Sequence, residues 1–268
     1  MTLVEICLDD LDGVPAAERA GADRVELCAS LGDGGITPSI GTVATALRSA
    51  RSIGINVLIR QRAGDFVYSA AEVDAMVDDI RAMRQLPNPS HVPLAFVVGA
   101  LRPDGTIDTD ATRRMLDAAG DSSVTFHKAF DQTPDLDASL DELIALGVAR
   151  VLTSGGAASA LEGAETLAAL VARADGRIAI LAGGGVRAAN AAEVVRRTGV
   201  AEVHLRAATA IPSASRAVGT AASVYDSGVR IATSEAIVRE LLDALGRGDG
   251  RELGDGRELG DGGEGAAA

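Results

Sequence analysis

Residues 3–8 read LVEICL and residues 24–29 read RVELCA, and these two short runs indicate the fold of the whole chain. In each run apolar residues alternate with a Glu-x-Cys pair, which is the period of a β-strand with one apolar face. Helical stretches separate these runs from six further candidate strands at 56–61, 94–101, 124–130, 150–154, 177–182 and 202–206. Eight strand-then-helix units are typical of a closed barrel, so we predict a single TIM (β/α)8 barrel.

The barrel is expected to span residues 1–246. From 247 to 268 the composition changes, and GDGREL occurs twice in a row at 248–253 and 254–259. Such a short, glycine-rich repeat cannot bury a core, so we predict a disordered tail. Helix starts are expected at Thr37-Pro38-Ser39, at Ser69, at Thr133-Pro134 and at Thr233-Ser234. The connection 207–232, which contains Tyr225, is expected to be an irregular surface loop, with a lid over the barrel mouth as the alternative.

Composition excludes several classes of protein. The formal net charge of −13 argues against a nucleic-acid partner. The chain opens directly into a candidate strand and has no long apolar run, so we expect a cytoplasmic protein without a membrane partner. Only 2% of the residues are aromatic, so Ala, Val, Leu and Ile must fill the core. Two cysteines cannot form a disulfide framework, and a reducing compartment would keep both as free thiols.

Strand alternation brings soft ligands together. The residues expected to point into the barrel are Glu5 and Cys7 on the first strand, Glu26 and Cys28 on the second, and Glu202, His204 and Arg206 on the eighth. Because strands eight, one and two are neighbours in a closed barrel, Cys7, Cys28 and His204 would lie near one mouth. Thiolates and imidazole favour Cu(I) or Zn(II). From these residues alone, buried apolar filler is the more common role of such cysteines, and His204 has the alternative of a core histidine paired with a glutamate such as Glu202 or Glu5.

A second group of residues suggests an anion. Arg60 and Arg62 share one face of the third strand, where they either pair with Glu5, Glu26 and Glu202 or bind a carboxylate or phosphate ligand. His127 and Asp131 close the fifth strand, where barrel active sites assemble, and form a candidate acid–base pair. Glu5 and Glu26 are further candidate acid–base groups. The alternative is that His127 only holds its loop.

Glycine-rich turns follow the sixth and seventh strands. Thr153 and Ser154 precede the first turn, and Gly183, Gly184 and Gly185 form the second, with Arg206 near it. Backbone N–H groups in such turns bind phosphate in many barrels, although glycines also simply permit tight turns. Asp65, in the loop after the third strand, completes the candidate substrate-binding set.

The chain resembles the CutC family, usually described as copper homeostasis proteins. The matching stretches are 5–7, 21–28, 34–39, 64–66 with 68–69, 125–127 with 129–131, 149–155, 183 with 185–187, and 202–204. The resemblance implies a TIM barrel, a cytoplasmic location and a Cu(I) site on Cys7 and Cys28. The chain departs from the family pattern at Gln61, at Ala63, at Val67, where some members have Cys, and at 205–206. A third sulfur ligand is therefore missing.

Two functions follow as expectations. In the first, Cys7 and Cys28 hold Cu(I), and the protein buffers or traffics copper. In the second, the barrel is an isomerase, lyase or hydrolase for a small anionic or phosphorylated metabolite, with His127 as acid or base. A homo-oligomer is compatible with either.

Overall fold

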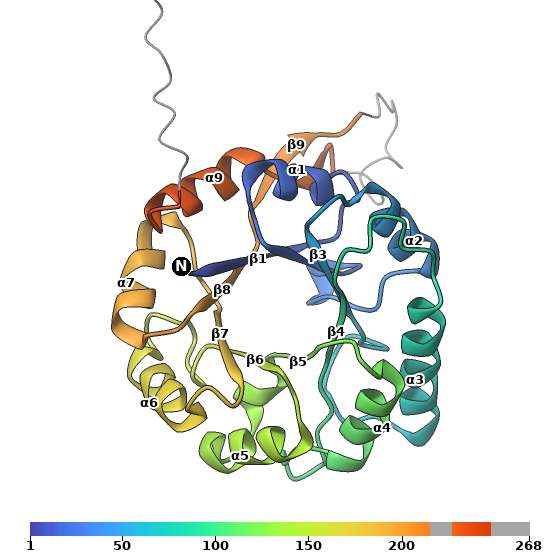
Figure 1. The fold of residues 1–268 in the computed structure, drawn as a ribbon, viewed down its shortest axis with the longest axis vertical. Helices are drawn as coiled ribbons and strands as arrows, with labels where there is room; N and C mark the ends of the chain where they lie inside the picture. The colour runs from blue at the N-terminus through green and yellow to red at the C-terminus, as the bar shows by residue number, and fades with distance from the viewer. Residues whose placement is uncertain (215–226, 248–268) are drawn as a thin grey trace, which may run out of the picture.

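Eight parallel strands form the centre of the protein in a computed structural model that describes residues 1–214 and 227–247. The strands pair in chain order, and β8 pairs with β1, which closes the barrel (Figure 1). They are β1 (Leu3–Leu8), β2 (Arg24–Leu27), β3 (Gly54–Leu58), β4 (Leu94–Val98), β5 (Val124–Phe126), β6 (Arg150–Thr153), β7 (Ala179–Gly183) and β8 (Glu202–Leu205). The predicted TIM (β/α)8 barrel is confirmed. Residues 248–268 of the predicted tail lie outside the described residues, so the domain boundary stays a prediction.

Helices surround the barrel (Figure 1). They are α1 (Gly13–Ala20), α2 (Ile40–Ser49), α3 (Ala70–Arg84), α4 (Thr109–Ala119), α5 (Leu136–Leu146), α6 (Ala164–Ala174), α7 (Ala188–Thr198) and α9 (Glu235–Ala244). In the part of the chain that the structure describes, none has both the length and the apolar character needed to cross a membrane.

Side-chain caps set where several helices begin. Ser69 and Glu72 form a capping box at α3, and Ser234 caps α9, as expected. The other two helices begin later than predicted. Ser39 caps α2 and Asp135 caps α5, so each preceding proline lies before its helix instead of in the first turn.

Several predicted strands end early, and the early ends of β3 and β5 affect the site. β3 stops at Leu58, so Arg60 lies in the following loop. β5 stops at Phe126, and a 3-10 helix, η2 (Lys128–Gln132), follows at once. The reason is local, because the Nδ1 atom of His127 accepts a hydrogen bond from the backbone N–H of Ala129 at 3.1 Å and turns the chain. A second 3-10 helix, η1 (Leu31–Asp33), follows β2.

The connection after β8 contains regular secondary structure, in contrast to the irregular loop that was predicted. Its described ends form β9 (Ala208–Pro212) and β10 (Val229–Thr233), which pair antiparallel. β-Branched residues at these ends favour extended backbone, which explains why the irregular-loop prediction was wrong there. Tyr225 lies outside the described residues.

The two faces of the strands differ in chemistry. Outward residues such as Val4, Ile6 and Leu8 pack beneath the helices, as the alternation predicts. The inward residues form a buried ionic network. Arg24 donates a hydrogen bond from Nε to Glu5 Oε2 at 2.6 Å and another from Nη2 to Glu202. Arg150 and Asn56 complete the pairing, with bonds to Glu202 and Glu5 respectively. These carboxylates therefore do not pair with Arg60 or Arg62.

Replacing Arg24 tests this network. Arg24→Met keeps the length of the side chain but leaves Glu5 and Glu202 without one of their cations, so we expect the free energy of unfolding to fall by about 3–5 kcal/mol. Chemical denaturation measures the change. Arg81→Met is the matched control, because Arg81 is exposed and, among the residues that the structure describes, pairs with Asp78 alone at 3.3 Å, so its effect should stay below about 1 kcal/mol. Equal effects of the two variants would contradict this assignment.

Candidate functional site

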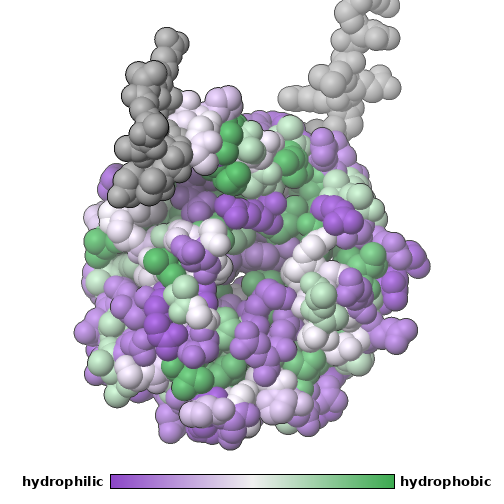
Figure 2. Space-filling view, turned by 180° about the vertical axis from the view of Figure 1, so that it is seen from behind, coloured by the Kyte–Doolittle hydropathy of each residue, from purple (hydrophilic) through white to green (hydrophobic). Residues whose placement is uncertain are grey.

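A pocket of about 170 Å³ lies at the carboxyl ends of the barrel strands, where barrel active sites assemble. Its lining combines ionisable and sulfur-containing side chains with an apolar wall. The polar members are Cys7, Glu26, Cys28, Arg60, His127, Lys128 and His204, and the remaining members are Leu31, Gly34, Leu58, Phe66 and Leu152. Figure 2 shows one face of the molecule hollowed near its middle, with mostly hydrophilic residues around the hollow.

The two cysteines meet in this pocket. Cys7 lies in β1, one residue before its end, and Cys28 directly follows β2. Both are free, buried thiols, and their Sγ atoms lie 3.9 Å apart. The shared hydrogen bond with Cys28 lowers the pKa of the Cys7 thiol to about 5, while the same bond and burial raise the pKa of Cys28 well above its usual value. The pair therefore holds one thiolate on Cys7 and one thiol on Cys28 at neutral pH.

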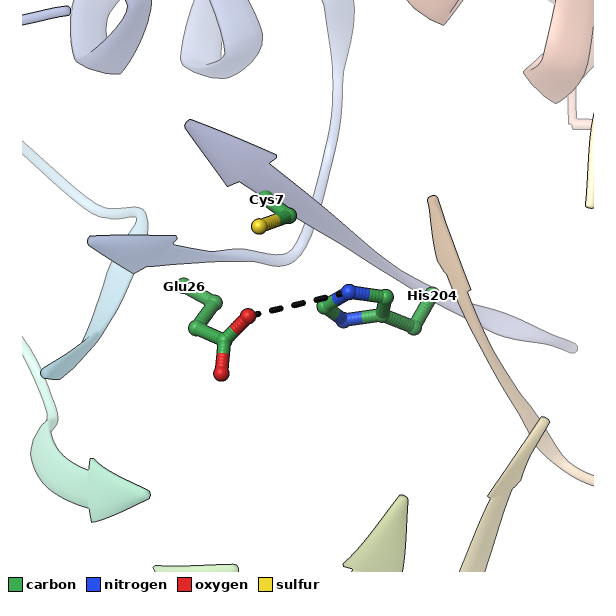
Figure 3. A group of neighbouring side chains, drawn as sticks. All are labelled: Cys7, Glu26 and His204. Carbon is green, nitrogen blue, oxygen red and sulfur yellow. Dashed lines mark ion pairs between the residues drawn. The ribbon is translucent and has the colours of Figure 1, made fainter. Parts of the chain in front are cut away.

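Cys7 also belongs to a group that can hold a metal ion. One ligand atom each from Cys7, Glu26 and His204 lie within 4.8 Å of one another, and all three side chains are buried (Figure 3). They come from β1, β2 and β8, the three neighbouring strands of the sequence prediction. Glu26, predicted as an acid–base group or as a partner of the arginines, thus lies among the candidate metal ligands.

His204 is held in place by two carboxyl groups. Its Nδ1 atom lies 2.8 Å from Glu5 Oε1, and its Nε2 atom lies 3.7 Å from Glu26 Oε2. Burial lowers the pKa of His204, but hydrogen bonds with Cys7 and Glu5 outweigh it and raise the pKa well above its usual value. From the sequence, pairing with a glutamate is the alternative to a ligand role for His204, and the Glu5 contact is such a pairing. The same contact directs the other ring nitrogen toward Cys7 and Glu26.

The glutamates carry different charges. Burial raises the pKa of Glu5, but the bond with His204 and the charge on Arg24 overcome this and lower it to about 2. Burial and the nearby Cys7 thiolate raise the pKa of Glu26 well above its usual value. Glu5 is therefore an anion beside His204, whereas Glu26 holds its proton more tightly than an ordinary glutamate does.

Arg60 and His127 line the same pocket from the loops after β3 and β5. The Arg60 guanidinium donates to the carbonyl oxygens of Gly34, Gly35 and Gly64 at 2.7–3.1 Å. Burial and the charge on Arg60 lower the pKa of His127 to about 3. His127 is consequently neutral, which suits a hydrogen-bond donor better than an acid at neutral pH.

Arg62 and Asp65 do not line this pocket. Arg62 points to the surface, where it pairs with Asp65 at 3.0 Å and with Glu72 at 2.6 Å. Arg206 is also apart from the pocket lining and lies 3.5 Å from Asp9.

The carboxylate of Asp131 binds the glycine-rich turn that follows β6. Asp131 accepts hydrogen bonds from Thr153 Oγ1, from the backbone N–H groups of Ser154 and Gly156, and from Lys128 Nζ. Burial raises the pKa of Asp131, but these bonds, led by that of Lys128, lower it overall. Asp131 therefore occupies donors that we assigned to phosphate and does not pair with His127.

The second glycine turn has the geometry of a tight turn. Gly184 and Gly185 have φ angles of 104° and 68°, which side chains other than glycine rarely adopt. Gly183 packs closely on Leu152, since a Cβ atom at Gly183 would lie 2.5 Å from Leu152 Cδ1. None of the three glycines lines the pocket described above. Their conformations support the tight-turn interpretation.

Lys128 is the ionisable pocket residue that the sequence prediction missed. Its Nζ atom lies 2.7 Å from both Asp131 Oδ2 and Ser154 Oγ. The only sequence signal was its place directly after His127, because the strand was expected to continue and alternation would then have turned Lys128 outward. The early end of β5 brings it to the pocket instead.

The thiol pair generates a test. In Cys28→Ala the hydrogen bond that stabilises the Cys7 thiolate is gone, so the pKa of Cys7 should rise from about 5 toward the ordinary thiol value. The pH profile of iodoacetamide alkylation, followed by mass spectrometry, should shift upward accordingly. In the matched Cys7→Ala variant, Cys28 should react slowly at neutral pH. An unchanged profile in Cys28→Ala would contradict the assignment.

Comparisons with known proteins agree on the family. The model of the CutC family matches residues 2–209. A CutC family protein of Mesorhizobium japonicum is 49% identical over 216 residues, covering 81% of this chain and 81% of the relative. A CutC family protein of Chromobacterium violaceum is 42% identical over 247 residues, covering 91% and 98% respectively.

Solved structures extend the comparison. A proposed copper homeostasis protein, CutC of Streptococcus agalactiae, has a TM-score of 0.71 and 36% identity, covering 76% of this chain and 98% of that one. Phosphoribosyl anthranilate isomerase of Thermococcus kodakaraensis has a TM-score of 0.54 but only 18% identity, over 92% of this chain and 100% of that one, so it shares the fold alone. With the family model spanning most of the barrel and relatives above 40% identity, this chain belongs to the CutC family.

Proposed function

We propose that this protein serves copper homeostasis by binding Cu(I) through Cys7 and Cys28 in the cytosol. The observation that carries the proposal is the 3.9 Å separation of two buried Sγ atoms in a pocket at the barrel mouth. Metal–sulfur bonds of about 2.3 Å, as in zinc sites, allow one ion to contact two sulfurs at this separation. Thiolates are the ligands that select Cu(I).

The charge state of the pair supports the proposal. Metal binding requires thiolates, and the Cys7 thiol has a pKa of about 5, so this ligand is already deprotonated at neutral pH. Cys28 would lose its proton as the ion binds. Free thiols persist in a reducing compartment, which is why we place the protein in the cytosol.

His204 is the additional candidate ligand. Glu5 contacts its Nδ1 atom at 2.8 Å and leaves Nε2 directed toward the thiolate. A carboxylate on the far nitrogen of a histidine is the usual way in which a metal-binding imidazole is oriented.

The alternative, a barrel enzyme that uses His127 as acid or base, has weaker support. The pKa of His127 is about 3, its Nδ1 atom accepts from Ala129, and Asp131 bonds to other partners. These contacts assign His127 to hydrogen bonding rather than to proton transfer.

Anaerobic titration with Cu(I) against a chromophoric chelator tests the copper proposal. The wild-type protein should bind one ion per chain tightly, and Cys7→Ser with Cys28→Ser should abolish this binding. His204→Gln should weaken it by roughly 10- to 100-fold, as expected when a supporting imidazole is lost.

The matched control is His127→Gln. This substitution changes the other histidine of the same pocket and should leave Cu(I) affinity unchanged. Wild-type Cu(I) affinity in the double cysteine variant would overturn the proposal. If His127→Gln lost as much Cu(I) affinity as His204→Gln, the assignment of the site to the side of His204 would be wrong.

A further inference from the structure

Arg60 is a buried cation without a carboxylate partner. Its side chain is part of the pocket lining, and the residue is only 7% exposed. Its three hydrogen bonds go to neutral carbonyl oxygens, its Nε atom has no partner, and no carboxylate of the described residues forms an ion pair with it. Arg24, the other buried arginine of the described residues, pairs with Glu5 and Glu202. A buried charge is costly unless an opposite charge compensates it.

His127 adds a directed donor to the same pocket. Its Nδ1 atom accepts from the Ala129 N–H, so in the neutral ring the proton lies on Nε2. This Nε2 atom is buried and has no hydrogen-bond partner, and the residue is 5% exposed. The ring cannot rotate freely, because it packs against Gly99, where a Cβ atom would lie 2.2 Å from the ring.

Phe66 links the two groups. Its ring centroid lies 5.0 Å from the Arg60 guanidinium carbon and 4.7 Å from the centroid of the His127 ring. With Leu31, Leu58 and Leu152, it gives the pocket an apolar wall beside these donors. A cavity of about 150 Å³ accommodates a molecule the size of benzene, so the volume of about 170 Å³ suits a ligand of only a few carbon atoms.

We propose that the pocket binds a small monocarboxylate, whose carboxylate group is held by Arg60 and His127 and whose short apolar part contacts Phe66 and the leucines. The assignment does not rest on the copper proposal. A carboxylate supplies the single negative charge that Arg60 lacks, and its oxygens accept from both donors. Lys128, at the pocket wall, contributes further positive potential although it is paired with Asp131.

Phosphate fits the same pocket less well. The backbone donors of the turn after β6 are occupied by Asp131, and the glycines after β7 do not line the cavity. Beyond Arg60 and Lys128, a doubly charged phosphate would lack the backbone N–H groups that phosphate sites use.

Calorimetric titration of the reduced, copper-free full chain with propionate tests the proposal, with inorganic phosphate at the same ionic strength as the competing probe. Propionate should bind saturably, and phosphate should not displace it. Arg60→Gln and His127→Phe should each weaken binding by roughly 10- to 100-fold, as expected for the loss of a hydrogen bond to a charged group.

Arg62→Gln is the matched control, because Arg62 belongs to the same loop but lies outside the pocket, and it should bind propionate as the wild type does. His127→Phe keeps an aromatic ring against Phe66, so it tests the site even if Arg60→Gln, which breaks three loop contacts, does not fold.

The double Cys7→Ser, Cys28→Ser variant separates the two proposals, because it should lose Cu(I) and retain propionate. Absence of saturable propionate binding to the wild type would overturn the carboxylate site. Displacement by phosphate, or unchanged affinity in His127→Phe, would overturn it as well.

Discussion

The Glu5 carboxylate is the group on which the interior of this barrel depends. It accepts hydrogen bonds from Arg24 and Asn56 on the neighbouring strands and contacts Nδ1 of His204 at 2.8 Å. Because the residue is only 1% exposed, its charge is supported entirely by these partners. The same anion therefore balances the ionic network of the barrel and orients the imidazole of the pocket. Stability of the barrel and geometry of the candidate metal site are coupled through one side chain.

The pocket above Glu5 has two chemically different sides. Strands β1, β2 and β8 contribute sulfur and imidazole, whereas the loops after β3 and β5 contribute Arg60, His127 and Lys128. A soft metal suits the first side and an anion suits the second. Both share a volume of about 170 Å³, so occupants of the two sides would lie close to each other.

The fold by itself says little about this chemistry. Isomerases with the same architecture and less than 20% identity share the closed barrel, but the function of a barrel depends on the side chains at its mouth. Membership of the CutC family rests instead on extensive sequence matches. Within this barrel, the contacts of Asp131 occupy the turn after β6, which the sequence analysis assigned to phosphate. It supplies from within the protein the negative charge that a bound phosphate would otherwise bring to the turn after β6.

Sequence alone determined the barrel and the thiol pair, because strand alternation is a local property. The Glu-x-Cys pattern of β1 and β2 is enough to place Cys7 and Cys28 on inward faces of adjacent strands, and the pattern of β8 adds His204. Only the tertiary structure decided the cationic side of the pocket. The place of Arg60 beyond the end of β3 depends on hydrogen bonds between loops, such as those of Arg60 to Gly34 and Gly35, whereas β5 ends at the local bond between Ala129 and His127. Arg60 lies at the pocket through its carbonyl partners and Lys128 through Asp131 and Ser154, while Arg62 stays at the surface with Asp65 and Glu72, because loop side chains follow their partners and not the period of a strand.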